Sequence, residues 1–456
     1  MKHLTIASAA AACGGVYCGP DEPALLQREI TFLTTDSRCA GEGCLFAAIA
    51  GSRVDGHDYI PAAMAQGALA VLCQRRPDDP SVPAVVVPST EAALQDIAAF
   101  YRAQFDLPVV GVTGSVGKTT AKEMIASVLS QRLRVLKTEK NFNNELGVPF
   151  TLFRLRPEHE AAVVEMGISG FGEMTRLARM AQPTMAVYTV IGWSHLAFLH
   201  DRAGVLRAKT EMLAGMAEDA PVFINGDDEY LAALECRQPL IRFGLGEGCD
   251  VRALDVRSCG TDGMTCSIVA GERRIPVRIA AWGAHLVYAA LAAAAVGLHM
   301  GLSDAEIAAG IAAYAPVGSR GGVCRAARWT VLDDCYNSNP SSARAALSSL
   351  ATLPGRRVCI LGDMLELGEQ SAALHRQLGE FAAAQGIDVI IACGTCAEQI
   401  YAGAVSVSPG QAWYFRDKQA LFSALPQLLR DGDYILVKAS HGERFCEIVQ
   451  LLMGEL

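Results

Sequence analysis

Residues 111–120 read GVTGSVGKTT, and this stretch decides how the centre of the chain folds. An apolar run, 107–112, leads into it and a helix-forming stretch, 121–132, follows it. A strand, a glycine-rich turn and a helix are the layout of a phosphate-binding loop. In such a loop, backbone N–H groups and the helix N-terminus hold phosphates, while a lysine and a hydroxyl reach the outer phosphates and Mg²⁺. The sequence therefore predicts a site for ATP or GTP.

The loop departs from the usual spacing at one position. Counting back five residues from Gly117 reaches Val112, where the pattern has its first glycine, although Gly111 and Gly114 lie nearby. The alternative is a solvated turn that carries a surface lysine. The strand and the helix on either side favour the phosphate loop.

Composition limits the partners and the compartment. A chain of 456 residues is long enough for two to four domains, each with its own core. Its net charge of −9 gives no electrostatic case for binding nucleic acid or an anionic membrane. The 15 cysteines are scattered and odd in number, which favours a reducing cytoplasm over a disulfide framework. Cys393 and Cys396 form a lone CxxC, without the second pair that a zinc site needs.

Two alanine-rich stretches resemble targeting or membrane segments only superficially. The first residues, MKHLTIASAAAACGG, are rich in alanine but contain no strongly apolar core, so we expect a short strand and a helix there. Residues 286–300 are too few and too alanine-rich to span a bilayer and indicate a packed helix. The sequence thus predicts a cytoplasmic protein without a membrane span.

We expect an α/β protein of three domains, 1–106, 107–317 and 318–456. The first is a small α/β domain; the second is a phosphate-loop domain with a parallel sheet and a β insertion at 251–279. The third repeats strand and helix without a phosphate loop, as in a doubly wound, Rossmann-like sheet. The strands that we expect lie at 68–73, 82–87, 161–164, 185–191, 221–224, 329–332, 358–361, 389–392 and 434–437, and the helices at 173–180, 203–216 and 285–299. Ser303 and Glu306 predict a capping box that opens a further helix.

Polar clusters mark candidate binding residues in the first domain. Asp36-Ser37-Arg38 could hold a phosphorylated ligand because a guanidinium fork matches phosphate geometry, and Asp55-Gly56-His57 forms a second cluster. Local turn chemistry, with Asp and Ser bonding the backbone, explains either cluster equally simply.

Further polar residues follow the strands of the central domain. Glu165 closes the strand AAVVE, His195 follows TVIGWS, and Lys209 lies in the helical segment RAKTEML. Carboxylate and imidazole groups at the carboxyl ends of neighbouring strands can converge on the phosphate site and hold a second Mg²⁺. Their structural alternatives are a capping carboxylate, a core histidine and a solvated lysine.

The third domain opens with its own polar segments. Residues 333–340, DDCYNSNP, follow a strand and precede a helix, so they could hold an amine substrate, although turn and N-cap chemistry also explains them. Arg320, at the domain junction, could reach the γ-phosphate or could be a surface arginine.

Together these motifs resemble the Mur ligases, the ATP-dependent amide-forming enzymes of peptidoglycan synthesis. The resemblance runs from about Asp36 to Glu447. It includes the variant loop TGSVGKTT, followed by NFNNELGVP, EMG, the histidine segment and AKTE in the family's order. DSR with DGHDYI, DDCYNSNP and LGDMLELG are most similar to the member of the family that adds the terminal dipeptide.

The resemblance implies a role for each site residue. It implies ATP, two Mg²⁺ ions and a carbamylated Lys209 as cofactors. ATP would be bound by Gly114, Ser115, Val116, Gly117, Lys118, Thr119, Thr120, His285 and Arg320. The metals would be held by Thr119, Glu165, His195 and Lys209, and the catalytic set would be Lys118, His195, Lys209 and Arg320. The substrates would be contacted by Ser37, Arg38, Asn143, Asn144, Asn337 and Asn339.

The resemblance also implies the reaction. ATP would convert a carboxylate of UDP-N-acetylmuramoyl-tripeptide to an acyl phosphate, and the amine of D-alanyl-D-alanine would displace the phosphate. We expect a monomer. The alternatives are a divergent paralogue that joins another amino acid or peptide to another acid, and a nucleotide-binding regulator that no longer ligates. Intact Lys118, Glu165, His195 and Lys209 count against the regulator.

Several positions depart from the family pattern. GRHNxxNALAA is replaced by GAHLVYAALAA, so Ala284, Leu286 and Ala289 stand where an arginine and two asparagines are usual. TNIG is TVIG at Val190, and the terminal KGSR is KASH at His441. These changes motivate the paralogue alternative, because they fall near the expected base and C-terminal substrate sites.

Overall fold

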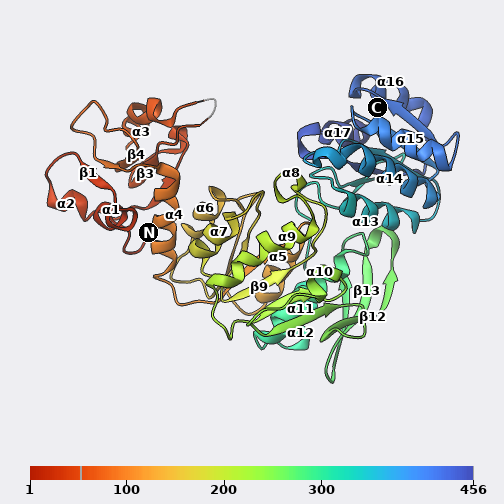
Figure 1. Ribbon diagram of the computed structural model, residues 1–456, viewed down its shortest axis with the longest axis horizontal. Helices are drawn as coiled ribbons and strands as arrows, with labels where there is room; N and C mark the ends of the chain where they lie inside the picture. Colours follow the sequence, from red (N-terminus) through yellow and green to blue (C-terminus); the bar gives the residue numbers. More distant parts are fainter. Residues whose placement is uncertain (52–53, 455–456) are drawn as a thin grey trace.

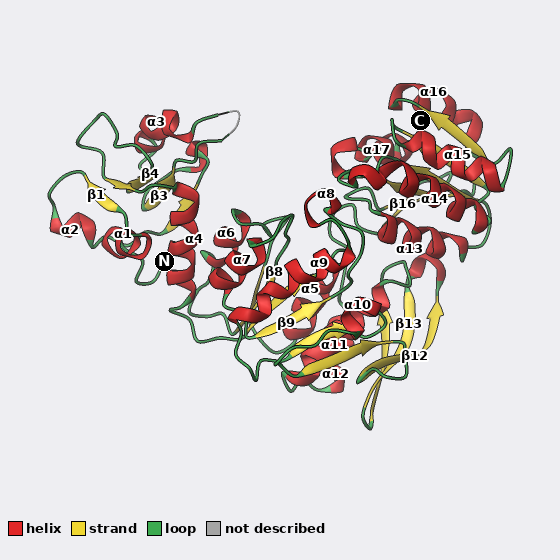
Figure 2. Ribbon diagram, in the orientation of Figure 1, coloured by secondary structure: helices red, strands yellow, loops and turns green. Residues whose placement is uncertain are grey.

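Three separate β-sheets organise the protein in the computed structural model, which describes residues 1–51 and 54–454. Each sheet is accompanied by its own helices (Figure 2). Figure 1 shows the three units following one another along a curved molecule, with the N-terminal unit and the C-terminal unit at opposite ends of the central one. The predicted α/β class with three units is confirmed.

The first sheet has the strand order β1-β5-β4-β3-β2 and is parallel except for β1, which runs antiparallel to β5. Its strands are β1 Val16–Cys18, β2 Phe32–Thr34, β3 Cys44–Ala47, β4 Ala70–Cys73 and β5 Ala84–Val86. Its helices are α1 Ile6–Cys13, α2 Pro23–Leu26, α3 Ile60–Ala65 and α4 Thr90–Arg102, with 3₁₀ turns η1 Ser37–Cys39 and η2 Gly56–Tyr59. Helix α4 leads into the next unit and is also bonded to it: its buried Arg102 donates from Nε to the backbone oxygen of Ala181 at 3.1 Å.

The strand expected at the very start of the chain is absent from the described residues. Thr5 makes only an isolated bridge to Glu29, and its side chain caps helix α1. The capping box between Thr5 and Ser8 explains the difference, because it starts a helix at Ile6 before a strand can form. The expected helix is confirmed.

The central sheet has nine described strands in the order β14-β13-β12-β11-β10-β9-β6-β8-β7. They are β6 Val109–Thr113, β7 Val135–Lys137, β8 Ala161–Glu165, β9 Met185–Tyr188, β10 Val222–Asn225, β11 Leu240–Gly244, β12 Val251–Ser258, β13 Met264–Ala270 and β14 Arg273–Ile279. The pairing is parallel from β7 to β12 and antiparallel from β12 to β14. The predicted β insertion is therefore an antiparallel extension of the same sheet.

The helices of the central unit are α5 Lys118–Leu129, α6 Gly147–Leu152, α7 Glu173–Ala181, α8 Leu196–Leu199, α9 Arg202–Thr210, α10 Glu229–Ala232, α11 Leu286–His299 and α12 Asp304–Ala312, with 3₁₀ turns η3 Glu211–Gly215 and η4 Gly260–Asp262. They carry several of its predicted site residues: Lys118, Thr119 and Thr120 on α5, and Lys209 on α9. The alanine-rich α11 is a packed core helix, as predicted. The capping box of Ser303 and Glu306 opens α12, also as predicted.

One expected helix is shorter than predicted. The helix expected over 203–216 ends as an α-helix at Thr210 and continues as the 3₁₀ turn η3. Glu211 explains the change, because its carboxylate accepts hydrogen bonds from the N–H groups of Gly172 and Thr175 at the start of α7. A negative charge at a helix N-terminus is stabilising. The interaction of Glu211 with the start of α7 therefore favours the tighter turn η3 over a continued α9.

The C-terminal sheet has the order β15-β16-β20-β17-β18-β19 and is parallel except for the edge strand β15. Its strands are β15 Gly322–Arg325, β16 Thr330–Asp333, β17 Arg357–Leu361, β18 Val389–Cys393, β19 Ala412–Phe415 and β20 Tyr434–Lys438. Its helices are α13 Pro340–Ala351, α14 Ser371–Ala384, α15 Ala397–Val407, α16 Lys418–Leu428 and α17 Cys446–Met453, with 3₁₀ turns η5 Gly368–Gln370 and η6 His441–Glu443. In the described part of the chain, no helix is both long and apolar enough to cross a membrane.

Candidate active site

The loop between β6 and α5 has a backbone that only glycine can follow at two places. Gly114 has φ 147° and Gly117 has φ 82°. A Cβ atom on Gly114 would lie 1.9 Å from Thr189 Oγ1, so a side chain cannot be accommodated there. The loop therefore turns tightly into the N-terminus of α5, where its N–H groups can bind an anion.

The segment that follows β9 supports this loop. Ser115 N donates to Val190 O at 2.7 Å, and Ser115 Oγ donates to Gly192 O at 3.2 Å. Thr189 Oγ1 donates to Val116 O on the other side of the turn. Val190 thus holds the loop through its backbone carbonyl, so the asparagine-to-valine departure at this position leaves the contact intact.

Lys118 lies folded over the loop. Its Nζ donates to Gly114 O at 2.8 Å and to Ser115 O at 3.4 Å. Burial lowers the pKa of Lys118, and Arg320 acts in the same direction while Glu165 opposes it. The loop lysine, the strand-end carboxylate and the junction arginine are therefore close enough to affect one another's charge.

Glu165, at the end of β8, has two oxygens in different environments. Oε1 accepts a hydrogen bond from Asn143 Nδ2 at 2.7 Å, and the backbone N–H of Glu165 donates to Thr138 Oγ1 at 3.0 Å. Oε2 is buried and has no hydrogen-bond partner among the described residues. A buried carboxylate oxygen without a partner is costly, and it is the kind of ligand that Mg²⁺ binds.

His195 begins helix α8 in a left-handed conformation, with φ 52°. Its Nδ1 lies 2.8 Å from Oε2 of Glu366, a residue of the C-terminal unit. Burial lowers the pKa of His195; Lys118 and Lys209 lower it further, and Glu366 opposes them. Both lysines therefore lie near the imidazole.

Lys209, on α9, is 1% exposed and makes no hydrogen bond or ion pair to the described residues through its Nζ. Burial, and then the charge of Lys118, lowers the pKa of Lys209 well below its ordinary value, with Glu173 opposing. Burial therefore favours the neutral form of this amine, which is its nucleophilic form. A solvated surface lysine, the alternative considered from sequence, is excluded.

These residues fit a Mg²⁺ site that is completed from outside the protein. No group of three His, Cys, Asp or Glu side chains converges anywhere in residues 1–51 and 54–454. Mg²⁺ takes one or two protein carboxylates and fills its shell with water and phosphate oxygens. Thr119, buried at the start of α5, Glu165 with its unpaired Oε2, and His195 fit such a partial shell. A carbamate on Lys209 would add a second carboxylate.

The C-terminal unit contributes a stack of side chains at the domain junction. The guanidinium of Arg320 lies 3.8 Å from the centroid of the Tyr336 ring, and that ring is 5.1 Å from the ring of His441. Arg320 is thus held by a cation–π contact near Lys118. His441, the departure from the family's arginine, is the third member of the stack.

The asparagines of the segment 333–340 serve local structure. Asn339 Oδ1 accepts from Ser342 N at 2.9 Å and caps α13, and Asn337 Oδ1 accepts from Ser338 N at 2.8 Å. Lys438, 2% exposed, anchors the segment through Asp334 Oδ2 at 2.6 Å. The turn and N-cap interactions that the sequence allows are present. These hydrogen bonds use only the Oδ1 atoms of the two asparagines, so their Nδ2 groups are left as donors for a ligand.

Residues 283–293, where the family pattern is broken, differ in their environments. His285 has a buried Nδ1 without a hydrogen-bond partner in the described structure, and burial lowers its pKa. Leu286 and Ala289 are core residues of the central unit. Tyr288 is closer to solvent and donates from its hydroxyl to Asp227 Oδ2 at 3.0 Å. The two lost asparagines are thus replaced by packed apolar side chains.

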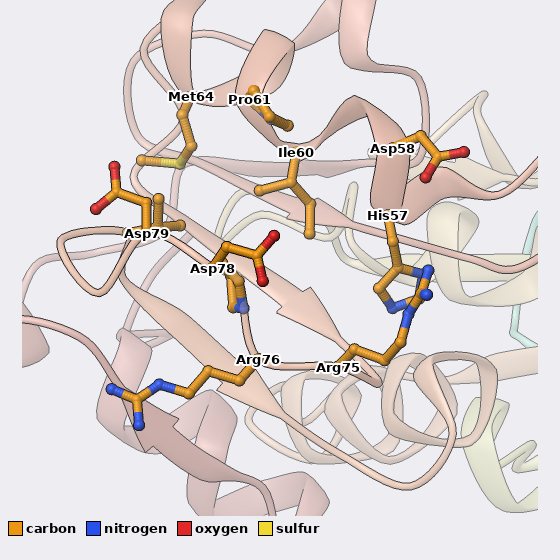
Figure 3. A pocket seen from close by; sticks show the side chains of 11 residues that line it. His57, Asp58, Ile60, Pro61, Met64, Arg75, Arg76, Asp78 and Asp79 are labelled. Carbon is orange, nitrogen blue, oxygen red and sulfur yellow. The ribbon is translucent and has the colours of Figure 1, made fainter.

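The predicted residues of the first unit lie apart from this set. Arg38 pairs with Asp36 at 2.6 Å, with 86% of its side chain exposed, and Ser37 begins η1 beside it. A cavity of about 580 Å³ lies in the same unit, and its lining includes His57, Arg75 and Arg76 but neither Ser37 nor Arg38. Figure 3 shows Arg75 extending toward His57 and Arg76 extending away from it.

The structure therefore brings together Lys118, Glu165, His195, Lys209 and Arg320. Asn143 joins them through Glu165, whereas Asn144 accepts from Gly147 N at 2.8 Å and holds its own turn. Sequence reasoning missed Thr138 and Glu366, which support Glu165 and His195. Thr138 lies directly after β7, and that position was an available signal; Glu366 lies further along, in the loop between β17 and η5.

Comparisons with known proteins cover all three units. Three family models match in turn: "Mur ligase family, catalytic domain" at residues 29–102, "Mur ligase middle domain" at 112–297 and "Mur ligase, glutamate ligase domain" at 320–441. A protein of Escherichia coli (strain K12), named UDP-N-acetylmuramoyl-tripeptide–D-alanyl-D-alanine ligase, is 37% identical over 429 residues, 92% of this chain and 93% of that protein. One of the same name from Bacillus subtilis (strain 168) is 35% identical over 438 residues, 94% and 95% of the two chains.

Solved structures resemble the whole molecule. A crystal structure of MurF from Acinetobacter baumannii superposes with a TM-score of 0.92 at 30% identity, covering 99% of both chains. The MurF ligase of Thermotoga maritima in complex with ADP has a TM-score of 0.84 at 27% identity, covering 95% of this chain and 99% of that one. The likeness extends from the first sheet to the last.

Proposed function

The chain belongs to the Mur ligase family, and we propose that it is the ATP-dependent ligase that joins D-alanyl-D-alanine to UDP-N-acetylmuramoyl-tripeptide in peptidoglycan synthesis. The observation that carries this function is the identity of 35–37% to ligases of that name over more than nine-tenths of both chains. The phosphate loop and the residues gathered beside it supply the matching chemistry.

The reaction needs an activated carboxylate. A carboxylate is a poor electrophile, so ATP transfers its γ-phosphoryl group to the carboxylate, which gives an acyl phosphate and ADP. The dipeptide amine then attacks the acyl carbon, and inorganic phosphate and a proton leave. The loop amides at 114–119 bind the phosphates, and Lys118 exchanges its contacts with Gly114 O and Ser115 O for phosphate oxygens. Arg320, 3.8 Å from the Tyr336 ring, is positioned to neutralise charge on the transferring group. No side-chain nucleophile is required.

Two Mg²⁺ ions complete the proposed site. We assign Thr119 to one ion, and Glu165, His195 and a carbamylated Lys209 to the other. Mg²⁺ supplies electrostatic stabilisation of the transferring phosphoryl group. Only a neutral amine can react with carbon dioxide, and burial favours that form of Lys209. The buried Oε2 of Glu165 has no hydrogen-bond partner in the described structure and is available to bind a cation. These two features support the assignment.

The substrates would approach from the flanking units. We propose that Ser37 and Arg38 contact the UDP part, that Asn143 and Asn144 contact the peptide carboxylate, and that Asn337 and Asn339 face the amine. His285 would contribute to the nucleotide site. Because ATP and a nucleotide-linked precursor are used, we place the reaction in the cytoplasm, with a monomer as the working unit.

A two-substrate assay tests the function. Phosphate release from ATP should depend on both UDP-N-acetylmuramoyl-tripeptide and D-alanyl-D-alanine, and K118M should abolish it. Protein that binds ATP but shows no turnover with that pair would overturn the assignment. Replacing D-alanyl-D-alanine by other amino acids and peptides tests the paralogue, which the His441 and Ala289 departures motivate.

A further inference from the structure

The loop that follows β17, residues 362–368, holds Glu366 in an unusual conformation. Glu366 has φ 65°, in the left-handed region that non-glycine residues rarely adopt. Such a conformation is strained and persists only where the surroundings fix it. Its side chain is 62% exposed, so packing of Glu366 itself does not fix it.

Hydrogen bonds from three elements hold the loop in place. The carboxylate of Asp363 accepts from the N–H groups of Thr395, Cys396 and Ala397 at the start of α15. The two residues before Glu366 are also fixed, because Met364 N donates to His375 Nε2 and Leu365 N donates to Ser440 Oγ, both at 2.9 Å. The fold therefore imposes the backbone that presents Glu366.

The presented carboxylate reaches across the domain boundary. Oε2 of Glu366 lies 2.8 Å from Nδ1 of His195 in the central unit. The neighbouring turn η5 lies against α8, since a Cβ on Gly368 would be 3.8 Å from the backbone of Ala197. Figure 1 shows α8 projecting from the central unit toward the C-terminal one.

The contact is poorly explained as a stabilising ion pair. Solvent-exposed ion pairs contribute little to stability, too little to offset the backbone strain at Glu366. Although the two atoms are 2.8 Å apart, His195 Nδ1 has no hydrogen-bond partner in the described structure, so the pair is not aligned as a hydrogen bond. Because most of the Glu366 side chain is exposed, its carboxylate has room to rotate into alignment with the Nδ1–H bond of His195.

We propose that Glu366 is a positioning residue for His195: its carboxylate accepts a hydrogen bond from Nδ1–H, which keeps the proton on Nδ1 and leaves Nε2 free and directed to Mg²⁺. Metal-binding histidines commonly donate their second ring N–H to a carboxylate, which fixes the tautomer and the ring orientation. Here that carboxylate comes from another domain. The metal site of the central unit is consequently finished only when the C-terminal unit is docked. This inference rests on the proposed assignment of His195 to Mg²⁺.

The test compares three variants. E366M removes the acceptor while keeping the side-chain length, and E366Q keeps an uncharged acceptor. E369M changes an exposed glutamate three residues away that forms no ion pair with His195 in the described structure. All three leave the φ requirement of the backbone unchanged, because no glycine is introduced or removed. Circular dichroism checks that each variant is folded.

The first readout needs neither metal nor substrate. In protein labelled with ¹⁵N-histidine at pH 8, two-bond ¹H–¹⁵N correlations distinguish the two ring tautomers, and H195Q identifies the His195 signals. Wild type, E366Q and E369M should show the Nδ1–H tautomer, whereas E366M should shift toward Nε2–H. An unchanged tautomer in E366M would overturn the proposal.

The second readout is the Mg²⁺ requirement. In E366M the Mg²⁺ concentration for half-maximal phosphate release should rise by about 10–100-fold, the usual effect of losing such a carboxylate. E366Q should recover part of the loss, and E369M should match wild type. An equal loss in E366Q and E366M would also contradict positioning through a hydrogen bond. If the tautomer shifts but the ligase assay fails with every substrate pair, the assigned reaction falls while the His195–Glu366 relationship stands.

Discussion

Asn143 donates from Nδ2 to Oε1 of Glu165 at 2.7 Å, which leaves Oε2 of the same carboxylate buried and without a hydrogen bond in the described structure. The asparagine thus fixes the orientation of the carboxylate and occupies only one of its oxygens. The free oxygen is the one that a cation can use. Asn143, assigned from sequence to substrate binding, therefore also supports the proposed metal site.

Replacing Asn143 by alanine should weaken Mg²⁺ binding through Glu165. We expect the Mg²⁺ requirement of phosphate release to rise about 10–100-fold, since an outer-shell partner is lost. N141A changes an exposed asparagine two residues away and is the matched control. E165Q should lose more activity than N143A. An N143A enzyme with the wild-type Mg²⁺ requirement would show that the bond is only structural.

Removing Lys209 should remove most of the activity. If its carbamate supports a metal, K209A should recover part of the turnover when short carboxylates such as acetate or formate are added. Wild-type protein in ¹³C-bicarbonate should give a carbamate signal by ¹³C NMR that is missing from K209A and present in K2A, an exposed-lysine control. The absence of both the carbamate signal and the rescue would contradict carbamylation, and Lys209 would then act through its own amine.

Substituting Gly114 by alanine should damage the loop. The residue has φ 147°, and its new Cβ would lie 1.9 Å from Thr189 Oγ1, so the loop must shift. We expect a stability loss of about 1–3 kcal/mol and a loss of ATP binding, measured by thermal unfolding and calorimetric titration. G215A is the control, since nothing lies within 4 Å of a Cβ there. ATP binding by G114A at wild-type affinity would contradict the proposed loop.

Acid should weaken the C-terminal unit through His375. Its Nε2 accepts from Met364 N at 2.9 Å and its Nδ1 donates to Ser371 O at 2.7 Å, so the folded protein needs the neutral ring. Burial lowers the pKa of His375 below the ordinary value of 6.5. Below about pH 6.5 the unfolded chain therefore binds a proton that the folded chain refuses, and stability falls as pH falls from there toward the folded pKa.

The effect can be measured by thermal unfolding between about pH 7.5 and about pH 5, a range that brackets the ordinary histidine pKa. H375Q should be less stable than wild type at neutral pH but should lose less stability on acidification. Burial lowers the pKa of the partly buried His159 and His285 as well, so the comparison between variant and wild type is the informative one. H3Q, at an exposed histidine, should keep the wild-type pH dependence. Identical slopes in H375Q and wild type would remove His375 from this role.

The local sequence determined the repeating parts of the molecule. Alternating apolar runs and helix-forming stretches predicted an α/β protein, because burial on both faces of a parallel sheet requires such runs. The loop at 111–120 was readable for the same reason: its strand, its glycines and its helix start are adjacent in the chain. Glu165 was found because it ends a strand. The prediction of a strand in the first few residues was wrong, because the capping box at Thr5 starts helix α1 there.

The tertiary structure decided which polar groups meet and which are already used. Asn339, which the sequence predicts to contact substrate, also caps α13 through its Oδ1, and the burial of Lys209 excludes a solvated lysine. Leu286 and Ala289 proved to be core residues. The contact between His195 and Glu366 joins two domains across a long stretch of chain. Sequence periodicity reports which face of an element is apolar, whereas burial, pKa and partner choice depend on the packing of distant elements, which only the folded chain sets.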